Sequence, residues 1–229
     1  MSNIIIDVDV VLGRLILLWT CNNLGRGEIF LNEILEVKKE EELNGLKETD
    51  TGRKFRYKVA VIGDGRVGKT SLIKRYTEGS FKKEYIKTLG AQFYTYDKKI
   101  NGDKIRLMFW DIAGQDKFHF LRPNFFKNSK AAIIVYSLEE NKFGRESFNH
   151  ITDWYNVLTK HCGEIPIVVF ANKVDLVDES KLDNSTIQDI VNNNSFLGYY
   201  ITSAQTGKGV TEAFNAIIET LTYKTLISG

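Results

Sequence analysis

The sequence predicts an α/β domain in which helices cover both faces of a mostly parallel, six-stranded sheet. Two observations lead to this prediction. From residue 56 onward, short apolar runs alternate along the chain with helical hydrophobic patterns, as in βαβ units. One pair of runs is joined across Asn101-Gly102, a hairpin signal that makes this pair antiparallel. Because such sheets bind ligands at the carboxyl ends of their strands, we expect functional motifs directly after strands.

The elements are expected in a regular order. Apolar or β-branched runs predict strands at residues 57–62, 93–100, 104–111, 131–136, 165–170 and 199–202. Helical spacing predicts helices at residues 68–76, 146–160, 184–193 and 210–223. Except across the hairpin, a helix or a long connection separates successive strands, which is the spacing that parallel pairing requires.

Composition indicates a globular protein and excludes several classes. Of the 229 residues, 43% are hydrophobic and 26% are charged, a balance typical of folded domains. The formal net charge of +2 leaves no electrostatic footprint for nucleic acid. Cys21 and Cys162 match no metal-ligand spacing and suggest a reducing compartment. Charges interrupt the most apolar stretch, residues 4–21, so we expect no integral membrane segment and a cytoplasmic location.

Residues 1–54 are expected to form an extension in front of a domain at residues 55–229. The extension carries ten acidic and seven basic side chains, a net charge of −3. Its β-branched start predicts a strand or hairpin, residues 28–43 an amphipathic helix, and the following segment a charged linker. Negative charge disfavours an anionic membrane as its target. Packing against the domain or a partner interface is therefore favoured.

The first functional motif is a glycine-rich segment directly after the first predicted strand. It has the form G-x-x-x-x-G-K-T and opens a helix, which is the pattern of a phosphate-binding P-loop. Glycines let backbone N–H groups approach phosphate oxygens, Lys69 supplies a positive charge, and the Thr70 hydroxyl can ligate Mg²⁺. The alternative, a glycine-rich turn with an exposed lysine, is disfavoured by this strand and helix context. The residues are Gly63, Asp64, Gly65, Arg66, Val67, Gly68, Lys69 and Thr70, followed by Ser71.

The second motif, residues 110–115, follows the second hairpin strand and reads W-D-I-A-G-Q. A carboxylate at Asp111 can hold Mg²⁺, usually through a water molecule. Gly114 can offer a backbone N–H to a terminal phosphate, and Gln115 can orient a water molecule for in-line attack. Alone, this pattern could also be a turn. Its place after the strand next to the P-loop strand favours the functional interpretation.

The third motif, residues 172–175, follows the strand predicted at 165–170 and reads N-K-V-D. A carboxylate at Asp175 can accept hydrogen bonds from guanine N1–H and from the N2 amine. Adenine has neither donor at these positions, so Asp175 would select the base. Asn172 and Lys173 complete the motif. The alternative is an ordinary polar loop, which the order of the three motifs disfavours.

Residues 57–223 resemble a small GTPase of the Ras superfamily, with the greatest similarity to the Rab branch. The resemblance rests on the three motifs, on Thr88, and on residues 202–204, which read T-S-A. It implies the small G domain form of the P-loop NTPase fold and the binding of GTP and GDP, with Mg²⁺ as cofactor. It also implies slow hydrolysis of GTP, in a switch whose partners are an effector, an exchange factor and a GTPase-activating protein.

The resemblance also implies roles for individual residues. Thr88 corresponds to the threonine that ligates Mg²⁺ together with Thr70 and Asp111. Phe81 would pack against guanine. The residues implied in catalysis are Gln115, Lys69 and Gly65, whose missing side chain leaves room for Gln115 in the transition state. The residues implied in the guanine-binding loop are Ser203, Ala204 and Gln205.

The chain departs from the family pattern at several positions. Gln205 replaces the lysine that usually follows Ser-Ala, which implies looser packing on guanine. The last five residues contain no cysteine for prenylation, and Ser2 stands where myristoylation needs glycine. These departures disfavour the Rab-like mode of membrane anchoring, and leave membrane association by another route as an alternative.

The remaining candidates have two interpretations each. Phe93, Trp110 and either Phe125 or Phe126 form an effector patch or pack in the core. A nucleotide-locked binding module and a P-loop ATPase or kinase are alternatives to the switch. Gln115 with Gly65 argues against the first alternative, and Asp175 against the second. The histidines, which do not cluster with acids or cysteines, are expected to be structural or solvated; they are His119, His150 and His161.

Overall fold

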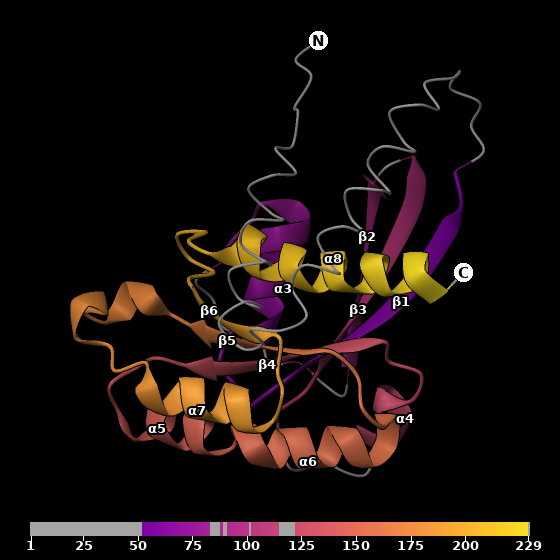
Figure 1. Cartoon of the computed structure of the whole chain (residues 1–229). Coiled ribbons are helices and arrows are strands. Elements are labelled where there is room, and N and C mark those ends of the chain that lie inside the picture. Colours follow the sequence, from indigo (N-terminus) through magenta and orange to yellow (C-terminus); the bar gives the residue numbers. More distant parts are fainter. Residues whose placement is uncertain (1–51, 83–87, 89–90, 101, 115–121, 229) are drawn as a thin grey trace, which may run out of the picture. The chain divides into compact units, whose positions relative to one another are not determined.

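A six-stranded sheet in the order β2-β3-β1-β4-β5-β6 organises the fold (Figure 1). The computed structural model describes residues 52–82, 88, 91–100, 102–114 and 122–228. β2 and β3 pair antiparallel, and every other neighbouring pair is parallel. The predicted sheet is therefore confirmed. The strands are β1 (Lys54–Ile62), β2 (Ala91–Ile100), β3 (Asp103–Ile112), β4 (Ala131–Ser137), β5 (Ile167–Asn172) and β6 (Gly198–Thr202).

Successive side chains of β1 point to opposite faces of the sheet and enter two separate cores. Val59 and Val61 belong to one buried cluster, whereas Ala60 and Ile62 belong to the other. This is the two-residue period of a strand that is covered on both faces. It explains why the sequence shows a continuous apolar run here instead of alternation.

Helices cover both faces, as Figure 1 shows. α3 (Lys69–Glu78) and α8 (Val210–Ser228) lie on one face. The other face is covered by α5 (Lys142–Asn149), α6 (Ile151–Cys162) and α7 (Ser185–Asn193). The short helix α4 (Arg122–Phe126) contacts α6 and β3. Two 3₁₀ turns, η2 (Val174–Leu176) and η3 (Glu179–Lys181), follow β5.

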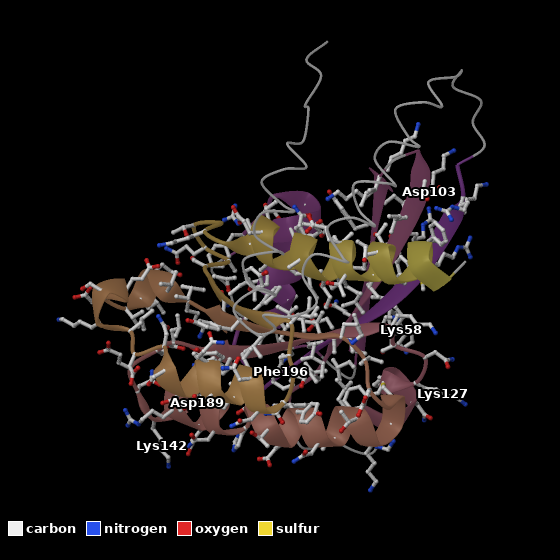
Figure 2. The ribbon with its side chains drawn as sticks, viewed as in Figure 1. Lys58, Asp103, Lys127, Lys142, Asp189 and Phe196 are labelled. Carbon is white, nitrogen blue, oxygen red and sulfur yellow. The ribbon has the colours of Figure 1, made fainter. Side chains whose placement is uncertain are left out.

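Charged and apolar side chains separate across the layer formed by α5, α6 and α7. Lys142 and Asp189 are exposed on its outer surface, whereas Phe196 lies between the helices and the sheet (Figure 2). The Phe196 ring meets the Tyr155 ring edge to face at 5.1 Å. This arrangement is the amphipathic pattern from which the helices were predicted.

The helix predicted at 146–160 is two helices in the structure. α5 begins at Lys142, because the Asn141 side chain accepts a hydrogen bond from Gly144 N–H (2.9 Å) and caps the first turn. α6 begins after His150, which ends α5 and turns its imidazole toward Asp64. The cap at Asn141 is local, whereas His150 contacts a residue far away in the chain.

Other predictions lie outside the described residues or stay untested. The strand and helix predicted within residues 1–54 fall almost entirely in this category, and the division into an extension and a domain stays a prediction. Cys21 also lies outside the described residues. Among the helices that the structure describes, none combines the length and the apolar character that crossing a bilayer requires.

An aromatic cluster joins α3, β3, β5 and α8 at the centre of one core. The ring of Phe214 stacks on Tyr76 at 4.4 Å and meets Phe109 and Phe170 edge to face at 5.2 Å each. Phe109, Phe170 and Phe214 are fully buried. One side chain of α8 therefore connects a helix and two strands of the sheet.

Replacing Phe214 with Ala should lower the free energy of unfolding by about 3 to 5 kcal/mol, because it leaves a cavity among three rings. Urea unfolding of the purified protein measures this change. Phe93→Ala is the matched control: Phe93 is 58% exposed, so its loss should cost less than about 1 kcal/mol. Equal losses in the two variants would contradict the assignment of Phe214 to the core.

Candidate functional site

The predicted motifs meet at one edge of the sheet, because parallel strands end at the same edge. β1 leads into the glycine-rich segment, β3 ends next to Asp111, and β5 ends at Asn172. β6 ends just before Ser203 and lies beside β5. The sheet order places the P-loop strand β1 between β3 and β4. Segments about 140 residues apart in the sequence are thereby brought into contact.

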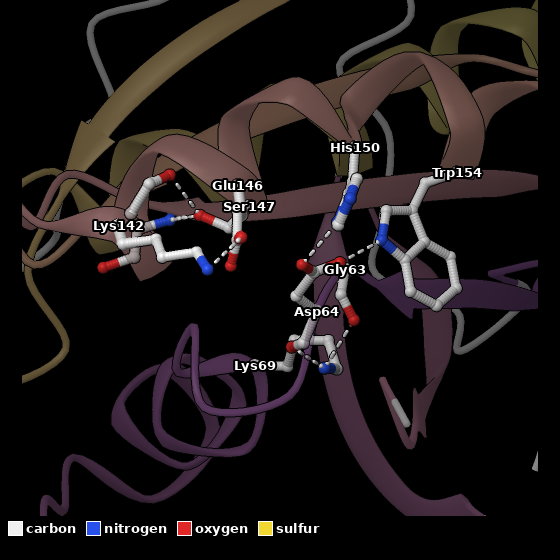
Figure 3. Close-up of polar contacts among 10 residues, drawn as sticks. Gly63, Asp64, Lys69, Lys142, Glu146, Ser147, His150 and Trp154 are labelled. Atoms are coloured by element: carbon white, nitrogen blue, oxygen red, sulfur yellow. Dashed lines mark hydrogen bonds and ion pairs between the residues drawn. The ribbon is translucent and has the colours of Figure 1, made fainter. Parts of the chain in front are cut away.

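The glycine-rich segment wraps around the amino end of α3. Gly68 adopts φ +102°, and a Cβ there would lie 2.3 Å from Asn172 Nδ2, so any larger residue would clash. Lys69 is buried, and its ammonium donates to the carbonyl oxygens of Gly63 (2.9 Å) and Asp64 (2.7 Å) (Figure 3). These bonds hold the positive charge of Lys69 over the loop.

Other residues of the segment differ in exposure. Val67 is fully buried and anchors the loop in the core, whereas Arg66 is exposed at φ +70°. Gly65 and Ser71 are half-buried. Val67 thus anchors the loop in the core, whereas the loop at Gly65 and Arg66 is accessible to solvent.

Three oxygen-bearing side chains meet beside Lys69. The hydroxyl oxygens of Thr70 and Thr88 are 3.1 Å apart. Both hydroxyls donate to Asp111 Oδ2, the one from Thr88 at 3.5 Å. The structure therefore brings together the three predicted Mg²⁺ ligands, although they come from α3, the segment before β2, and β3.

The second oxygen of Asp111 has no partner among the described residues. Asp111 Oδ1 is buried and makes no hydrogen bond there. Burial raises the pKa of the Asp111 carboxyl above its ordinary value, although the Lys69 ammonium and the two threonine hydroxyls favour the charged form. A buried carboxylate oxygen without a partner is unfavourable unless a cation or water reaches it. Hydroxyl and carboxylate oxygens are the ligands that Mg²⁺ prefers, so these residues fit the ion.

The second motif lies against the P-loop at Gly114. A Cβ on Gly114 would lie 2.3 Å from backbone atoms of residues 63–65, so only glycine allows this approach. Gln115, the predicted catalytic residue, lies outside the described residues.

Asn172 links the P-loop to the loop after β6. Its side-chain amide donates to Val67 O (2.8 Å), and its oxygen accepts from Ala204 N–H (3.2 Å). Ser203 Oγ donates to Asp175 Oδ1 at 2.5 Å. Asn172 and Ser203 are buried, whereas Asp175 is exposed. The buried Asn172 and Ser203 thus hold the loops after β5 and β6 in place, and the Asp175 carboxylate lies exposed beside them.

Lys173, within the motif at residues 172–175, lies near the same aromatic ring as Arg66 of the P-loop. Its ammonium forms an ion pair with Glu139 Oε2 at 2.5 Å and lies 5.4 Å from the centre of the Phe143 ring. The Arg66 guanidinium lies 5.9 Å from the same ring. Lys173 adopts φ +71°, a conformation that a non-glycine residue holds only when its surroundings enforce it.

The other residues predicted to contact the guanine base lie around Arg75 of α3. Phe81 is half-buried, with its ring centre 5.9 Å from the Arg75 guanidinium carbon. Ala204 is buried, whereas Gln205 is exposed, and Arg75 donates to the carbonyl oxygens of both. Sequence analysis missed Arg75, because its partners lie about 130 residues away and leave no local signal.

A second missed contact fixes Asp64. Its carboxylate accepts from Trp154 Nε1 (2.8 Å) and bonds His150 Nδ1 (2.7 Å), as Figure 3 shows. His150 therefore has a structural role, which is one of the two roles expected from the sequence. A cavity of about 340 Å³, also lined by Gly65 and Gly114, borders this contact.

The aromatic candidates divide between surface and core. Phe93 is 58% exposed, and its ring lies 4.3 Å from that of Trp110, which lies 6.1 Å from Phe125. Phe126 is fully buried and belongs to the core. The Lys58 ammonium lies 3.5 Å from the Trp110 ring. Phe93, Trp110 and Phe125 thus form the continuous aromatic patch, and Phe126 is excluded from it.

Comparison with known proteins identifies the family. The family model described as Ras family matches residues 58–223. The Ras-related protein Rab-21 of Bos taurus is 39% identical over 166 residues, which cover 71% of this chain and 72% of that protein. Rab-21 of Homo sapiens is 38% identical over 71% of each chain. Rab-21 of Geodia cydonium is 35% identical over 158 residues, 69% of this chain and 67% of its own.

The chain therefore belongs to the Ras family, as a Rab-like small GTPase. The expected family and enzyme class are confirmed. As a member of this family it is a small GTP-binding switch.

The contact between His150 and Asp64 should make stability depend on pH. The hydrogen bond and charge of Asp64, with smaller contributions from Asp153 and Glu146, raise the pKa of His150, while burial lowers it. Because the folded pKa exceeds the unfolded value of about 6.5, the stabilisation is complete below that value. It is lost as the pH rises through the folded pKa.

Wild-type protein should exceed His150→Gln in free energy of unfolding by at most about 1 kcal/mol at pH 6, since the imidazole is half exposed and screened by solvent. The difference should shrink at pH 8.5. Urea unfolding of both proteins at the two pH values measures it, and the comparison cancels the other titrating groups. A difference that grows with pH would show that the ion pair does not form.

Proposed function

We propose that this GTPase binds GTP and GDP together with Mg²⁺ and hydrolyses GTP slowly. The observation that carries the proposal is the cluster of Thr70, Thr88 and Asp111, with one buried carboxylate oxygen that has no partner in the described part of the chain. In a purely structural cluster, this buried oxygen would be expected to have a hydrogen-bond partner. In a cation site beside a phosphate-binding loop, the oxygen is free to ligate the ion.

Phosphate binding would rest on the P-loop. Lys69 already lies over the loop with its ammonium held by two carbonyl groups, so little reorganisation is needed to meet β- and γ-phosphate oxygens. Backbone N–H groups at the amino end of α3 add partial positive charge. Thr70, Thr88 and Asp111 would hold Mg²⁺, which when bound neutralises charge on the phosphates.

Base recognition would rest on the loops after β5 and β6. Asp175 accepts from guanine N1–H and the N2 amine, and the backbone of residues 203–205 faces O6. The link from Asn172 to Val67 and Ala204 supports this proposal, because it fixes the distance between the phosphate and base sites. Phe81, beside Arg75, would cover one face of the base.

Hydrolysis would depend on positioning and charge stabilisation. Gln115 orients the attacking water molecule, and Gly65 leaves room for it. Some GTPases carry a catalytic arginine shortly before the threonine that corresponds to Thr88. This chain has Tyr85, Ile86 and Lys87 at those positions. Without such an arginine we expect slow turnover.

The γ-phosphate would order the segments around Thr88 and Gly114, which relax after hydrolysis. These segments, together with the aromatic patch of Phe93, Trp110 and Phe125, would be read by an effector. An exchange factor and a GTPase-activating protein would complete the cycle. The cytoplasmic location expected from the sequence stays a prediction.

Hydrolysis in single-turnover assays of GTP-loaded protein with Mg²⁺ should proceed at about 10⁻⁴ to 10⁻³ s⁻¹. Gln115→Leu should be slower still, with unchanged GTP affinity, because the water loses its guide while the phosphates keep every contact. Phosphate release and equilibrium binding provide the two measurements.

Two outcomes would contradict the proposal. Turnover faster than about 10⁻² s⁻¹ is the class with an arginine in cis, and would require one in this chain. Bound GTP that stays intact in the wild type would identify a nucleotide-locked module. Arg106→Ala, an exposed β3 residue paired only with Asp97 among the described residues, is the control that should leave both measurements unchanged.

A further inference from the structure

Arg75 connects α3 to the loop after β6 through two of its nitrogen atoms. Nε donates to Ala204 O at 2.7 Å, and Nη2 donates to Gln205 O. Nη1 donates to Gly79 O at 3.2 Å, at the end of the same helix. One half-buried guanidinium thus holds two successive carbonyl groups of a distant loop.

Holding a carbonyl group also directs the N–H group of the same peptide. In a trans peptide the C=O and the N–H of the next residue point in opposite directions. With the Ala204 carbonyl fixed on Arg75, the Gln205 N–H must point away from α3. In the described part of the chain this N–H makes no hydrogen bond. The neighbouring Ala204 N–H is turned toward Asn172.

The rest of the loop is held by its own bonds. Ser203 N–H donates to Lys208 O (2.9 Å), and Gly207 N–H donates to Ser203 O (2.8 Å). Thr206 N–H donates to Ser203 Oγ at 3.0 Å. Of the N–H groups at residues 203–207, the Gln205 N–H is therefore the one that bonds no acceptor among the described residues.

We propose that Arg75 is the positioning residue that aims the Gln205 N–H at O6 of the guanine base. The inference rests on the proposed base recognition and adds to it the residue that sets its geometry. Arg75 also lies against the Phe81 ring at 5.9 Å. It therefore links the loop that meets the edge of the base to the ring that covers its face.

Arginine suits this role because its guanidinium is planar, permanently charged, and carries several donors in a fixed fork. A lysine ammonium carries its donors without a planar fork, so it would not fix the relative orientation of the two carbonyl groups. The role matters more here because Gln205 replaces the family lysine, so the backbone of the loop has less side-chain packing to hold it.

The test compares three nucleotides in wild-type protein, Arg75→Ala and Arg75→Lys. GDP presents O6, N1–H and the N2 amine. Inosine diphosphate lacks the N2 amine but keeps O6. 2-Aminopurine riboside diphosphate lacks O6 and the N1 proton but keeps the amine. Equilibrium dissociation constants with Mg²⁺ give two discrimination ratios for each protein, and contacts to ribose and phosphate cancel within each ratio.

In wild-type protein GDP should bind more tightly than either analogue. Arg75→Ala should lower the preference for GDP over the 2-aminopurine nucleotide by about 3- to 10-fold, the value of one misdirected hydrogen bond. Its preference for GDP over inosine diphosphate should stay unchanged, because that ratio reports Asp175. Arg75→Lys should lie between wild type and Arg75→Ala, and Arg106→Ala should match the wild type.

Other outcomes distinguish a failure of the proposed base recognition from a failure of the role assigned to Arg75. If the wild type does not distinguish GDP from either analogue, the proposed base recognition fails. If it does, and Arg75→Ala keeps both ratios, Arg75 does not position the loop. Equal reductions of both ratios would assign Arg75 a general structural role and overturn the inference. Should Arg75→Ala not fold, Arg75→Lys alone decides by the same two ratios.

Discussion

The site depends above all on the two hydrogen bonds of the buried Asn172 amide, which connect the P-loop at Val67 with the base loop at Ala204. Both loops follow strands of one sheet, but the sheet alone does not set the distance between them. A buried amide makes its bonds in one geometry, because leaving either group unpaired would cost about 1 to 3 kcal/mol. Gly68 permits the approach, since any Cβ there would strike this amide.

Around this frame, the polar side chains of the described site residues have hydrogen-bond partners, with one exception. The Lys69 ammonium has two carbonyl partners, and the Asp64 carboxylate bonds His150 and Trp154. Asp111 Oδ1 is left without a hydrogen bond among the described residues. Such a group calls for a physical explanation, and a bound ion or water molecule is one. Asp111 Oδ1 lies beside the P-loop, where the phosphates of the proposed nucleotide require a cation.

Sequence reasoning predicted the sheet, its hairpin and the convergence of the motifs, because strand ends and turn residues leave local signals. It placed the start of β1 too late, since Lys54 and Arg56 pair with β3 although they are polar. It merged α5 with α6 and missed the cap at Asn141. Arg75 and the partners of His150 could not be predicted, because their contacts join positions 86 to 130 residues apart.

The central proposal is that the Asp175 carboxylate, at this edge of the sheet, selects guanine. The most direct measurement is the affinity of Asp175→Asn for GDP and for xanthosine diphosphate, with Asp178→Asn as the control. The account predicts that Asp175→Asn loses about 10- to 100-fold in GDP affinity and gains affinity for the xanthine nucleotide, whose C2 carbonyl can accept from the new amide. The control should behave as the wild type. An Asp175→Asn protein that keeps its preference for GDP would contradict the account.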